Sequence, residues 1–257
     1  MTFPRLDDAA SSLPERGVSR SVPWTWRDLA AGVAGVLVLL FVLAVISLPL
    51  VDHYGEETTG GRLTQVAVNI AWYLGSIVLV YAIVSHRGAT WRDLGLRAPR
   101  AVAGSNAWLR LPGSIAIYLL MAYGLVIAYV YLVQILGLDF LEPDQQLPDD
   151  TYESTAVVIA TGALVVFGAP LVEETLFRGF MFAKLRMHLA FIPAAALSGS
   201  LFSLAHGDPG LIIPFTAVGM VLAYAYERTG TLWASIGLHF CFNTITFFIL
   251  VFVPDAR

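Results

Sequence analysis

The sequence predicts an all-α integral membrane protein with about seven transmembrane helices, within a range of six to eight. Of the 257 residues, 57% are apolar, only 13% are charged, and the mean hydropathy is +0.72, whereas roughly a quarter of the residues of a soluble domain are charged. The apolar residues fall in runs of about 20, the length that a helix needs to cross a bilayer. The net charge of −4 is too small to indicate a nucleic-acid partner. The apolar composition instead indicates that the protein is surrounded by the lipid bilayer.

Seven apolar segments are the candidate spans. In chain order they are residues 29–51, 64–84, 111–136, 155–182, 189–206, 211–226 and 233–253. The fifth and sixth are the shortest, which gives the range of six to eight crossings. The first is longer than the apolar core of a cleaved signal peptide and no small-x-small cleavage site follows it closely, so we expect a retained anchor.

The charges between the spans predict their direction, because Lys and Arg near span ends are retained on the cytoplasmic side. With a cytoplasmic N-terminus, 13 of the 15 Lys and Arg residues lie inside, and Arg62 and Arg257 lie outside. Residues 138–154 contain no basic residue but six carboxylates, and we expect them to form an outside loop. The excess of arginine over lysine, 14 to 1, is typical of a GC-rich bacterial genome and favours a bacterial plasma membrane.

The predicted organisation has three parts. Residues 1–28 form a cytoplasmic tail, residues 29–154 form the N-terminal membrane helices with the acidic loop at their end, and residues 155–253 form a C-terminal membrane domain. Polar side chains inside the spans gather in this last part, where each charged group costs about 2.5–3.5 kcal/mol even on a lenient insertion scale. The polar groups are Glu173, Glu174 and Arg178 in the fourth span, His206 at the end of the fifth, four residues after Phe202, and His239 and Asn243 in the seventh.

Helical spacing places the side chains of Glu173 and Glu174 on different faces of the fourth span. Glu174 and Arg178 are four residues apart, so they share a helix face and can form an ion pair that shields both, with or without a role in chemistry. Glu173 points about 100° away and has no such partner in the sequence. Because burial disfavours an unpaired charge, Glu173 is the better candidate for a proton-transfer group.

His239 and Asn243 are also four residues apart and present two hydrogen-bond donors on one face. Fixed donors of this kind can form an oxyanion hole. Taken singly, Asn243 could instead be a polar contact between helices and His206 a satisfied core histidine. A carboxylate, two histidines and an amide at three span positions together favour a functional site.

In chain order, these three groups resemble the E-E-x-x-x-R, F-x-x-x-H and H-x-x-x-N motifs of the CPBP family, which contains the type II CAAX prenyl endopeptidases and many bacterial relatives. Each motif is weak alone, but all three in order on apolar helices are specific. The resemblance implies a CPBP-type helical bundle in which residues 155–253 are the catalytic domain. It also implies hydrolysis, within the membrane, of a peptide bond in a membrane-associated protein or peptide.

Carried over position by position, the resemblance implies a role for each residue. Glu173 is the general base for a water that His206 also holds, and His239 with Asn243 stabilises the oxyanion. Glu174, Arg178 and Phe202 are supporting residues. Members of the family are often labelled metalloproteases, and a zinc site made of His206, His239 and Glu173 is chemically feasible. The chain lacks the His-Glu-x-x-His helix of zinc peptidases, so the metal-free mechanism is favoured while zinc stays open.

Two other function classes stay open. A catalytically inactive scaffold or immunity protein would retain the same fold and motifs. A proton-coupled transporter could use the same buried carboxylates and histidines, but is less favoured because its polar residues would be distributed over both halves of the chain.

The mechanism requires Glu173 and His206 to meet, although their distances from the cytoplasmic end differ. Glu173 lies 11 residues before Lys184, ~16 Å along a helix, and His206 lies 20 residues after Arg186, ~30 Å. We therefore expect the fifth span to begin with an interfacial or tilted stretch near Pro193. The turn at residues 207–210 is then expected to lie within the depth of the membrane.

Overall fold

The computed structural model describes residues 21–99, 107–143 and 147–253, and within these ranges all regular structure is helical. Residues 1–20 of the predicted tail, Arg100, Asp144 and Arg257 lie outside the described residues. The α-helices are α2 (Trp26–Tyr54), α3 (Thr59–His86), α4 (Ala107–Leu136), α5 (Thr155–Ala163), α6 (Ala169–Glu174), α7 (Ala183–Arg186), α8 (Phe191–Leu204), α9 (Ile212–Thr229) and α10 (Leu232–Phe252). Two π-helical segments, η3 (Leu164–Gly168) and η4 (Thr175–Phe182), and three short 3₁₀ segments, η1 (Asp139–Leu141), η2 (Asp149–Tyr152) and η5 (Pro209–Leu211), complete the list.

The predicted fold class is confirmed. Six helical stretches of the described chain are long and apolar enough to cross a membrane, and α8 is a shorter apolar helix of 14 residues. The segments from α5 to α7 run on without a break as one helix, Thr155–Arg186. The predicted spans match these helices one for one, and the largest difference is at α3, which begins at Thr59 rather than at residue 64.

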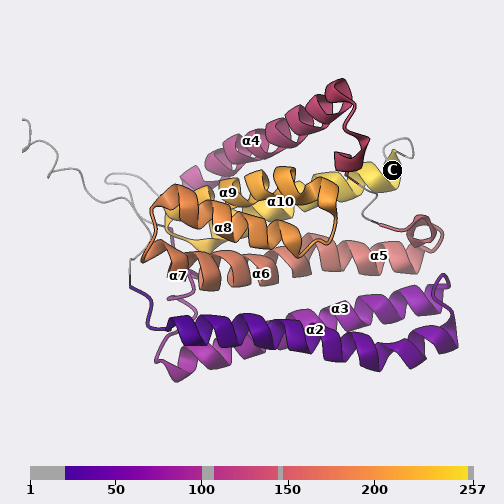
Figure 1. Ribbon diagram of the computed structural model, residues 1–257, viewed down its shortest axis with the longest axis horizontal. Coiled ribbons are helices and arrows are strands. Elements are labelled where there is room, and N and C mark those ends of the chain that lie inside the picture. The colour runs from indigo at the N-terminus through magenta and orange to yellow at the C-terminus, as the bar shows by residue number, and fades with distance from the viewer. Residues whose placement is uncertain (1–20, 100–106, 144–146, 254–257) are drawn as a thin grey trace, which may run out of the picture.

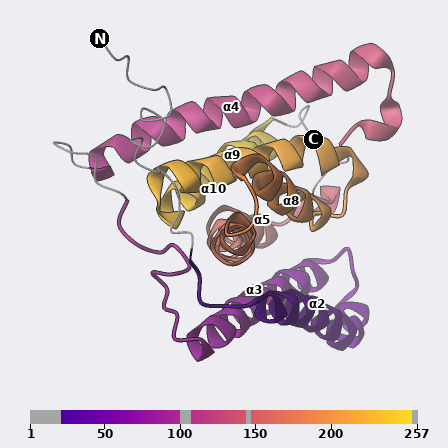
Figure 2. The ribbon, with the colours of Figure 1, turned by 60° about the vertical axis from the view of Figure 1, so that its left-hand side comes forward.

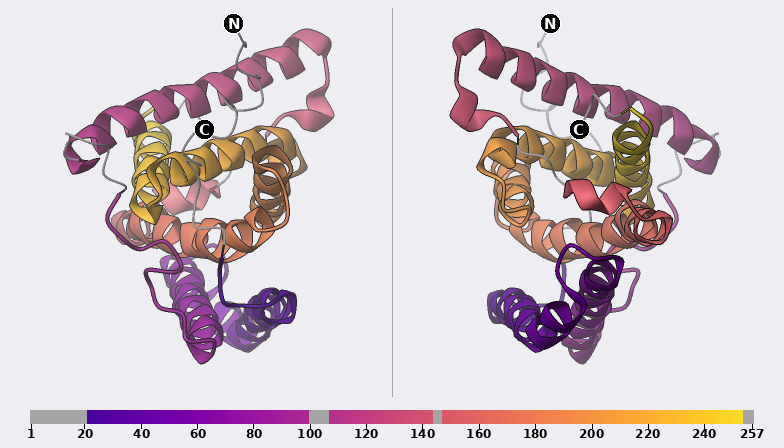
Figure 3. Two further views of the ribbon diagram at one scale, coloured as in Figure 1. Left: turned by 90° about the vertical axis from the view of Figure 1, so that its left-hand side faces the viewer. Right: turned by 90° about the vertical axis from the view of Figure 1, so that its right-hand side faces the viewer.

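The helices form three layers (Figures 1 and 2). The antiparallel pair α2 and α3 forms one outer layer, and α4 lies alone on the opposite side. Between them, the long α5–α7 helix, the α8–α9 hairpin and α10 form a ring in the end-on views of Figure 3. This middle layer carries all three sequence motifs.

The outer helices are apolar on both of their faces, as lipid requires. Many of their large side chains are exposed, including Phe41 and Leu48 on α2 and Leu120 and Ile135 on α4. The inner contact of α2 begins with Trp24, which is fully buried and donates its indole N–H to the Phe180 carbonyl at 3.2 Å. That bond ties the start of the α2–α3 layer to the middle layer.

The depth difference between Glu173 and His206 is resolved by a break in the helix. Residues 187–190 are not helical, so α8 begins only at Phe191 and carries His206 15 residues further along, ~22 Å. Pro193 sits in the first turn of α8, and the interfacial or tilted start of the fifth span stays a prediction. Proline suits this position since the first helical N–H groups have no partner within the helix.

The turn between α8 and α9 stops well short of the ends of α2, α3 and α5 (Figure 1). Asp208 accepts a 2.7 Å hydrogen bond from the Gly210 N–H and so fixes the turn. A side chain at Gly210 would collide with the Glu142 backbone. The turn is therefore covered by the start of the acidic loop as well as by helices.

The π-helical segments on both sides of α6 were not predicted. In η3 the Ala169 N–H bonds to the Leu164 carbonyl, five residues back, and in η4 the Ala183 N–H bonds to the Arg178 carbonyl. Pro170 lies two residues after the end of η3 and has no N–H to donate. Among the described backbone, the Val165 carbonyl is thereby left without its helical donor.

Candidate active site

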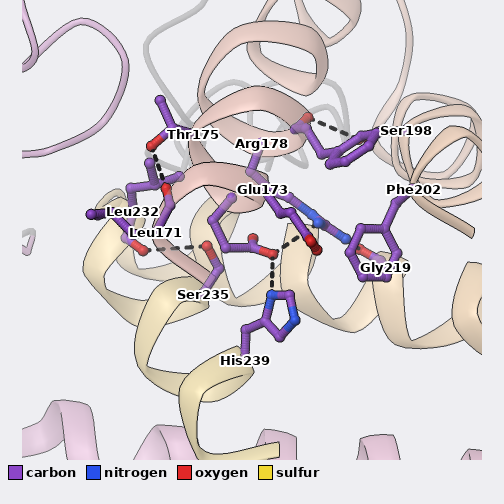
Figure 4. A network of polar contacts seen from close by, with 12 residues as sticks. Leu171, Glu173, Thr175, Arg178, Ser198, Phe202, Gly219, Leu232, Ser235 and His239 are labelled. Atoms are coloured by element: carbon purple, nitrogen blue, oxygen red, sulfur yellow. Dashed lines mark hydrogen bonds and ion pairs between the residues drawn. The ribbon is translucent and has the colours of Figure 1, made fainter. Parts of the chain in front are cut away.

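A buried network holds the centre of the middle layer together (Figure 4). Glu174 and Arg178 have fully buried side chains, and Nη1 of Arg178 donates to Oε1 of Glu174 at 2.9 Å. Nδ1 of His239 lies 3.0 Å from the same oxygen. Because a carboxylate only accepts, Nδ1 of His239 carries the hydrogen in this contact. The predicted Glu174–Arg178 pair therefore exists, and His239 from α10 joins it.

Arg178 reaches this position because α8 and α9 come very close together. A side chain on Gly199 would lie 2.7 Å from the Thr216 carbonyl, and one on Gly219 would lie 2.7 Å from Cα of Gly199. The close approach brings the Gly219 carbonyl to within 3.0 Å of Nη2 of Arg178. The guanidinium also lies 4.5 Å from the centre of the Phe202 ring, so cation–π attraction adds to the ion pair.

Glu173 is only partly buried, and its side chain lies beside this network, within electrostatic reach of Arg178 (Figure 4). Its Oε1 accepts a 2.6 Å hydrogen bond from the hydroxyl of Tyr73 on α3. Its Oε2 is buried and has no hydrogen-bond partner among the described residues. A buried carboxylate oxygen without a donor is costly, and a water or a substrate N–H would satisfy it.

His206 lies just beyond the end of α8, where Nδ1 is 2.8 Å from the Phe202 carbonyl. A carbonyl can only accept, so Nδ1 carries the hydrogen and Nε2 is the free position of the neutral ring. Edge-to-face contacts with Phe202 and Phe215, at 4.7 and 4.8 Å between ring centres, hold the imidazole plane. The side chain is therefore oriented by both a hydrogen bond and packing.

Asn243 is positioned by the irregular backbone of η3. Its Nδ2 donates to the Val165 carbonyl at 2.9 Å, the same carbonyl that Pro170 leaves without a backbone donor. An amide nitrogen has two hydrogens. The second hydrogen of Asn243 is left for a further acceptor.

Two cavities that share part of their lining bring the motif residues together. Glu173, His206, Asn243 and Tyr73 line a pocket of about 230 Å³, whose remaining wall is largely apolar. His206, His239 and Asn243 line a smaller cavity of about 20 Å³, roughly the space of one water. His206 and Asn243 stand in the wall of both cavities, so the three motifs meet around a single polar centre.

The proposed zinc ligands do not form a ligand cluster here. In the described part of the chain, no three His, Cys, Asp or Glu side chains come together in a way that could hold a metal ion. His239 engages Glu174, and Glu173 engages Tyr73. The donor set thus does not fit a three-ligand zinc site, and no step below uses a metal.

Two features of the site differ from the sequence analysis. Tyr73 lies in the second predicted span, in the half of the chain that carried no motif, and no pattern distinguishes it from the other tyrosines of the outer helices. Arg178 was counted among the cytoplasmic charges, but it is fully buried beside Glu174. It therefore contributes to the site and not to the charge asymmetry of the loops.

Comparison with known proteins agrees with the geometry. Residues 155–245 match the family model of the Rce1-like type II CAAX prenyl endopeptidases. The chain is 25% identical over 206 residues to the putative membrane peptidase YdiL of Bacillus subtilis, covering 78% of this chain and 80% of that protein. It is 25% identical over 241 residues to the membrane-embedded CAAX protease MroQ of Staphylococcus aureus, covering 90% of this chain and 92% of that one.

No solved structure matches the chain significantly. The family match covers the helices that carry Glu173, Glu174, Arg178, His206, His239 and Asn243. The expected resemblance is thus confirmed for the C-terminal domain. Residues 155–245 are thus similar to the Rce1-like type II CAAX prenyl endopeptidase domain, and the chain as a whole is similar to bacterial membrane peptidases.

Proposed function

We propose that this protein is an intramembrane endopeptidase of the bacterial plasma membrane that hydrolyses a peptide bond in a membrane-associated protein or peptide. The observation that carries the proposal is the meeting of Glu173, His206 and Asn243 at one pocket inside a helical membrane bundle. The three residues come from three helices that are far apart in the sequence. They supply an acceptor, a histidine and an amide donor, the groups that hydrolysis of an amide requires.

Glu173 and His206 activate the water. Glu173 lines the pocket, and its Oε2 has no hydrogen-bond partner among the described residues, so Oε2 is the atom that takes the proton when the water oxygen attacks the scissile carbonyl carbon. Nε2 of His206 accepts a hydrogen bond from the second O–H of the water. That hydrogen bond orients the water for attack. Glu173 then gives this proton to the amide nitrogen as the carbon–nitrogen bond breaks, so the leaving group departs as a neutral amine and the carboxylate is regenerated.

Asn243 and His239 stabilise the oxyanion. The second amide hydrogen of Asn243 is a fixed donor, because the first is held by the Val165 carbonyl. His239 uses its Nδ1 hydrogen on Glu174, so a hydrogen on Nε2 is the one that it can donate to the oxyanion. Glu174, Arg178 and Phe202 hold His239 in place and do not touch the substrate.

The lining of the pocket also indicates which residues the substrate carries beside the scissile bond. Its walls near Glu173 are formed by apolar and aromatic side chains, including Leu147, Phe247 and Leu250. Such walls favour apolar residues beside the scissile bond. A peptide from the membrane itself or from its surface meets that requirement.

The test is cleavage of membrane-anchored peptides by the purified protein in liposomes, read out by mass spectrometry against a Glu173→Ala control. Defined cleavage products that are absent with the variant support the enzyme. If wild-type and variant protein give the same products, or neither gives any, the inactive scaffold or immunity protein is the better account. A proton-coupled transporter would instead acidify or alkalinise the liposome interior without releasing a peptide.

A further inference from the structure

We infer that Tyr73 is a positioning residue for the Glu173 base, an inference that rests on the proposed function. Tyr73 lies on α3, outside the matched domain at residues 155–245. Its hydroxyl donates to Oε1 of Glu173 at 2.6 Å, and its side chain lines the same pocket of about 230 Å³. The N-terminal membrane helices therefore contribute a polar group to the site.

The hydrogen bond leaves one carboxylate oxygen for chemistry. Oε1 is occupied by the tyrosine hydroxyl, while Oε2 is buried without a partner among the described residues. A phenol in an apolar setting is a neutral donor, and its bond to an ionised carboxylate is charge-assisted and short. Tyr73 thus fixes the rotation of the carboxylate and determines which oxygen receives the proton from water.

The tyrosine is itself held in place. The neighbouring Trp72 donates its indole N–H to the Val36 carbonyl of α2 at 3.1 Å, and the Trp72 and Tyr73 rings lie 5.1 Å apart. The α2–α3 layer is in turn fastened to η4 by Trp24. Glu173 is thereby oriented by a helix from a different layer, and motions of its own helix are restrained.

Tyr73→Phe removes the hydroxyl and keeps the ring. We expect kcat to fall about 10- to 100-fold, the loss typical of one charge-assisted hydrogen bond, with KM for the same peptide unchanged within about twofold. The melting temperature should stay close to that of the wild type. Tyr81→Phe is the matched control, because Tyr81 is on the same helix and stacks on Trp91, away from the pocket.

A double-mutant cycle distinguishes positioning from a general structural role. In a Glu173→Gln background, Tyr73→Phe should change the residual rate of cleavage by less than about twofold. The substrate is the membrane-anchored peptide that the wild type cleaves fastest. Equal rate losses in both backgrounds would overturn the inference, because Tyr73 would then act independently of Glu173.

Infrared spectroscopy tests the contact without turnover. A carboxylate band that disappears in Glu173→Gln should shift in Tyr73→Phe and stay in place in Tyr81→Phe. A Tyr73→Phe protein with the wild-type band and the wild-type kcat would reject the inference while leaving the proposed function intact. If Glu173→Gln itself cleaves as fast as the wild type, the proposed function and the positioning role both fail.

Discussion

Glu173 and Glu174 are neighbours in the sequence but have different surroundings. Glu174 is fully buried between a guanidinium and an imidazole, whereas Glu173 is only partly buried, lines a pocket and accepts from Tyr73. The helical offset between consecutive residues accounts for the difference. At the scale of residues, the sequence therefore predicted the division between a paired and an unpaired carboxylate, because the i,i+4 spacing of Glu174 and Arg178 alone implies it.

The polar partners of these residues were less predictable. From the sequence, His239 was expected to act with Asn243, or with His206 and Glu173 on zinc. Its Nδ1 instead engages Glu174, 65 residues away in the chain. Tyr73 is 100 residues from Glu173. Contacts over such separations depend on how helices pack, and local spacing carries no information about them.

Asn243→Ala tests the oxyanion donor. We expect kcat to fall by roughly 10²–10³, the usual cost of losing one such donor. KM should change little, because the charge that Asn243 meets exists only in the transition state. Steady-state cleavage of a membrane-anchored peptide measures both constants.

Asn69→Ala is the control for that substitution, since Asn69 makes a similar side-chain bond to the Gln65 carbonyl on exposed α3. It should leave both constants at wild-type values. A rise in KM with unchanged kcat for Asn243→Ala would show that Asn243 binds the ground state instead.

At the scale of elements, hydropathy located all seven helices because lipid requires about 20 apolar residues for each crossing. It did not reveal the π-helical segments, since the pattern of apolar residues is nearly the same in α and π geometry. It also began the fifth span at residue 189, whereas residues 187–190 form a linker and α8 begins at Phe191. Pro170 was the one local sign of an irregular backbone in the fourth span.

Pro170→Ala tests whether that irregularity serves the site. The new N–H can bond within the helix and compete with Asn243 for the Val165 carbonyl. We expect kcat to fall about 10-fold, while the melting temperature stays the same or rises because alanine favours a helix. Peptide cleavage and thermal unfolding, followed on one preparation, measure the two effects.

Pro112→Ala in α4 is the matched control, because Pro112 is exposed within a helix and lies outside the pocket. It should not change kcat. Unchanged turnover in Pro170→Ala, with Asn243→Ala inactive, would show that the proline does not position Asn243.

At the scale of the whole molecule, charge predicts the orientation in the membrane. With Arg178 placed inside the bundle, the cytoplasmic side keeps 12 of the 13 basic residues first assigned to it. The ends of α3, α7 and α9 and the starts of α2 and α10 all lie at one end of the molecule, opposite the acidic loop (Figure 1). With the start of α2 at one end of the molecule and the end of α10 at the other, the chain crosses an odd number of times. The turn between α8 and α9 stops short of the end where the acidic loop lies.

Cysteine labelling in intact cells tests the orientation. In a Cys241→Ala background, Glu142→Cys should react with a membrane-impermeant maleimide, and Arg97→Cys should react only after the cells are permeabilised. The positive-inside distribution is the physical reason. Labelling of Arg97→Cys from outside would reverse the assignment of both termini.

The central claim is that Glu173 performs the chemistry and Glu174 holds the site together. The most direct measurement compares peptide cleavage and thermal unfolding for Glu173→Gln and Glu174→Gln in liposomes. Glu173→Gln should unfold like the wild type, and its cleavage rate should fall roughly 10²- to 10⁴-fold, because glutamine has the size of glutamate but cannot accept the proton. Glu174→Gln leaves Arg178 without its counter-charge and should lose about 3–5 kcal/mol of stability. A stable, inactive Glu174→Gln protein beside an active Glu173→Gln protein would contradict the account.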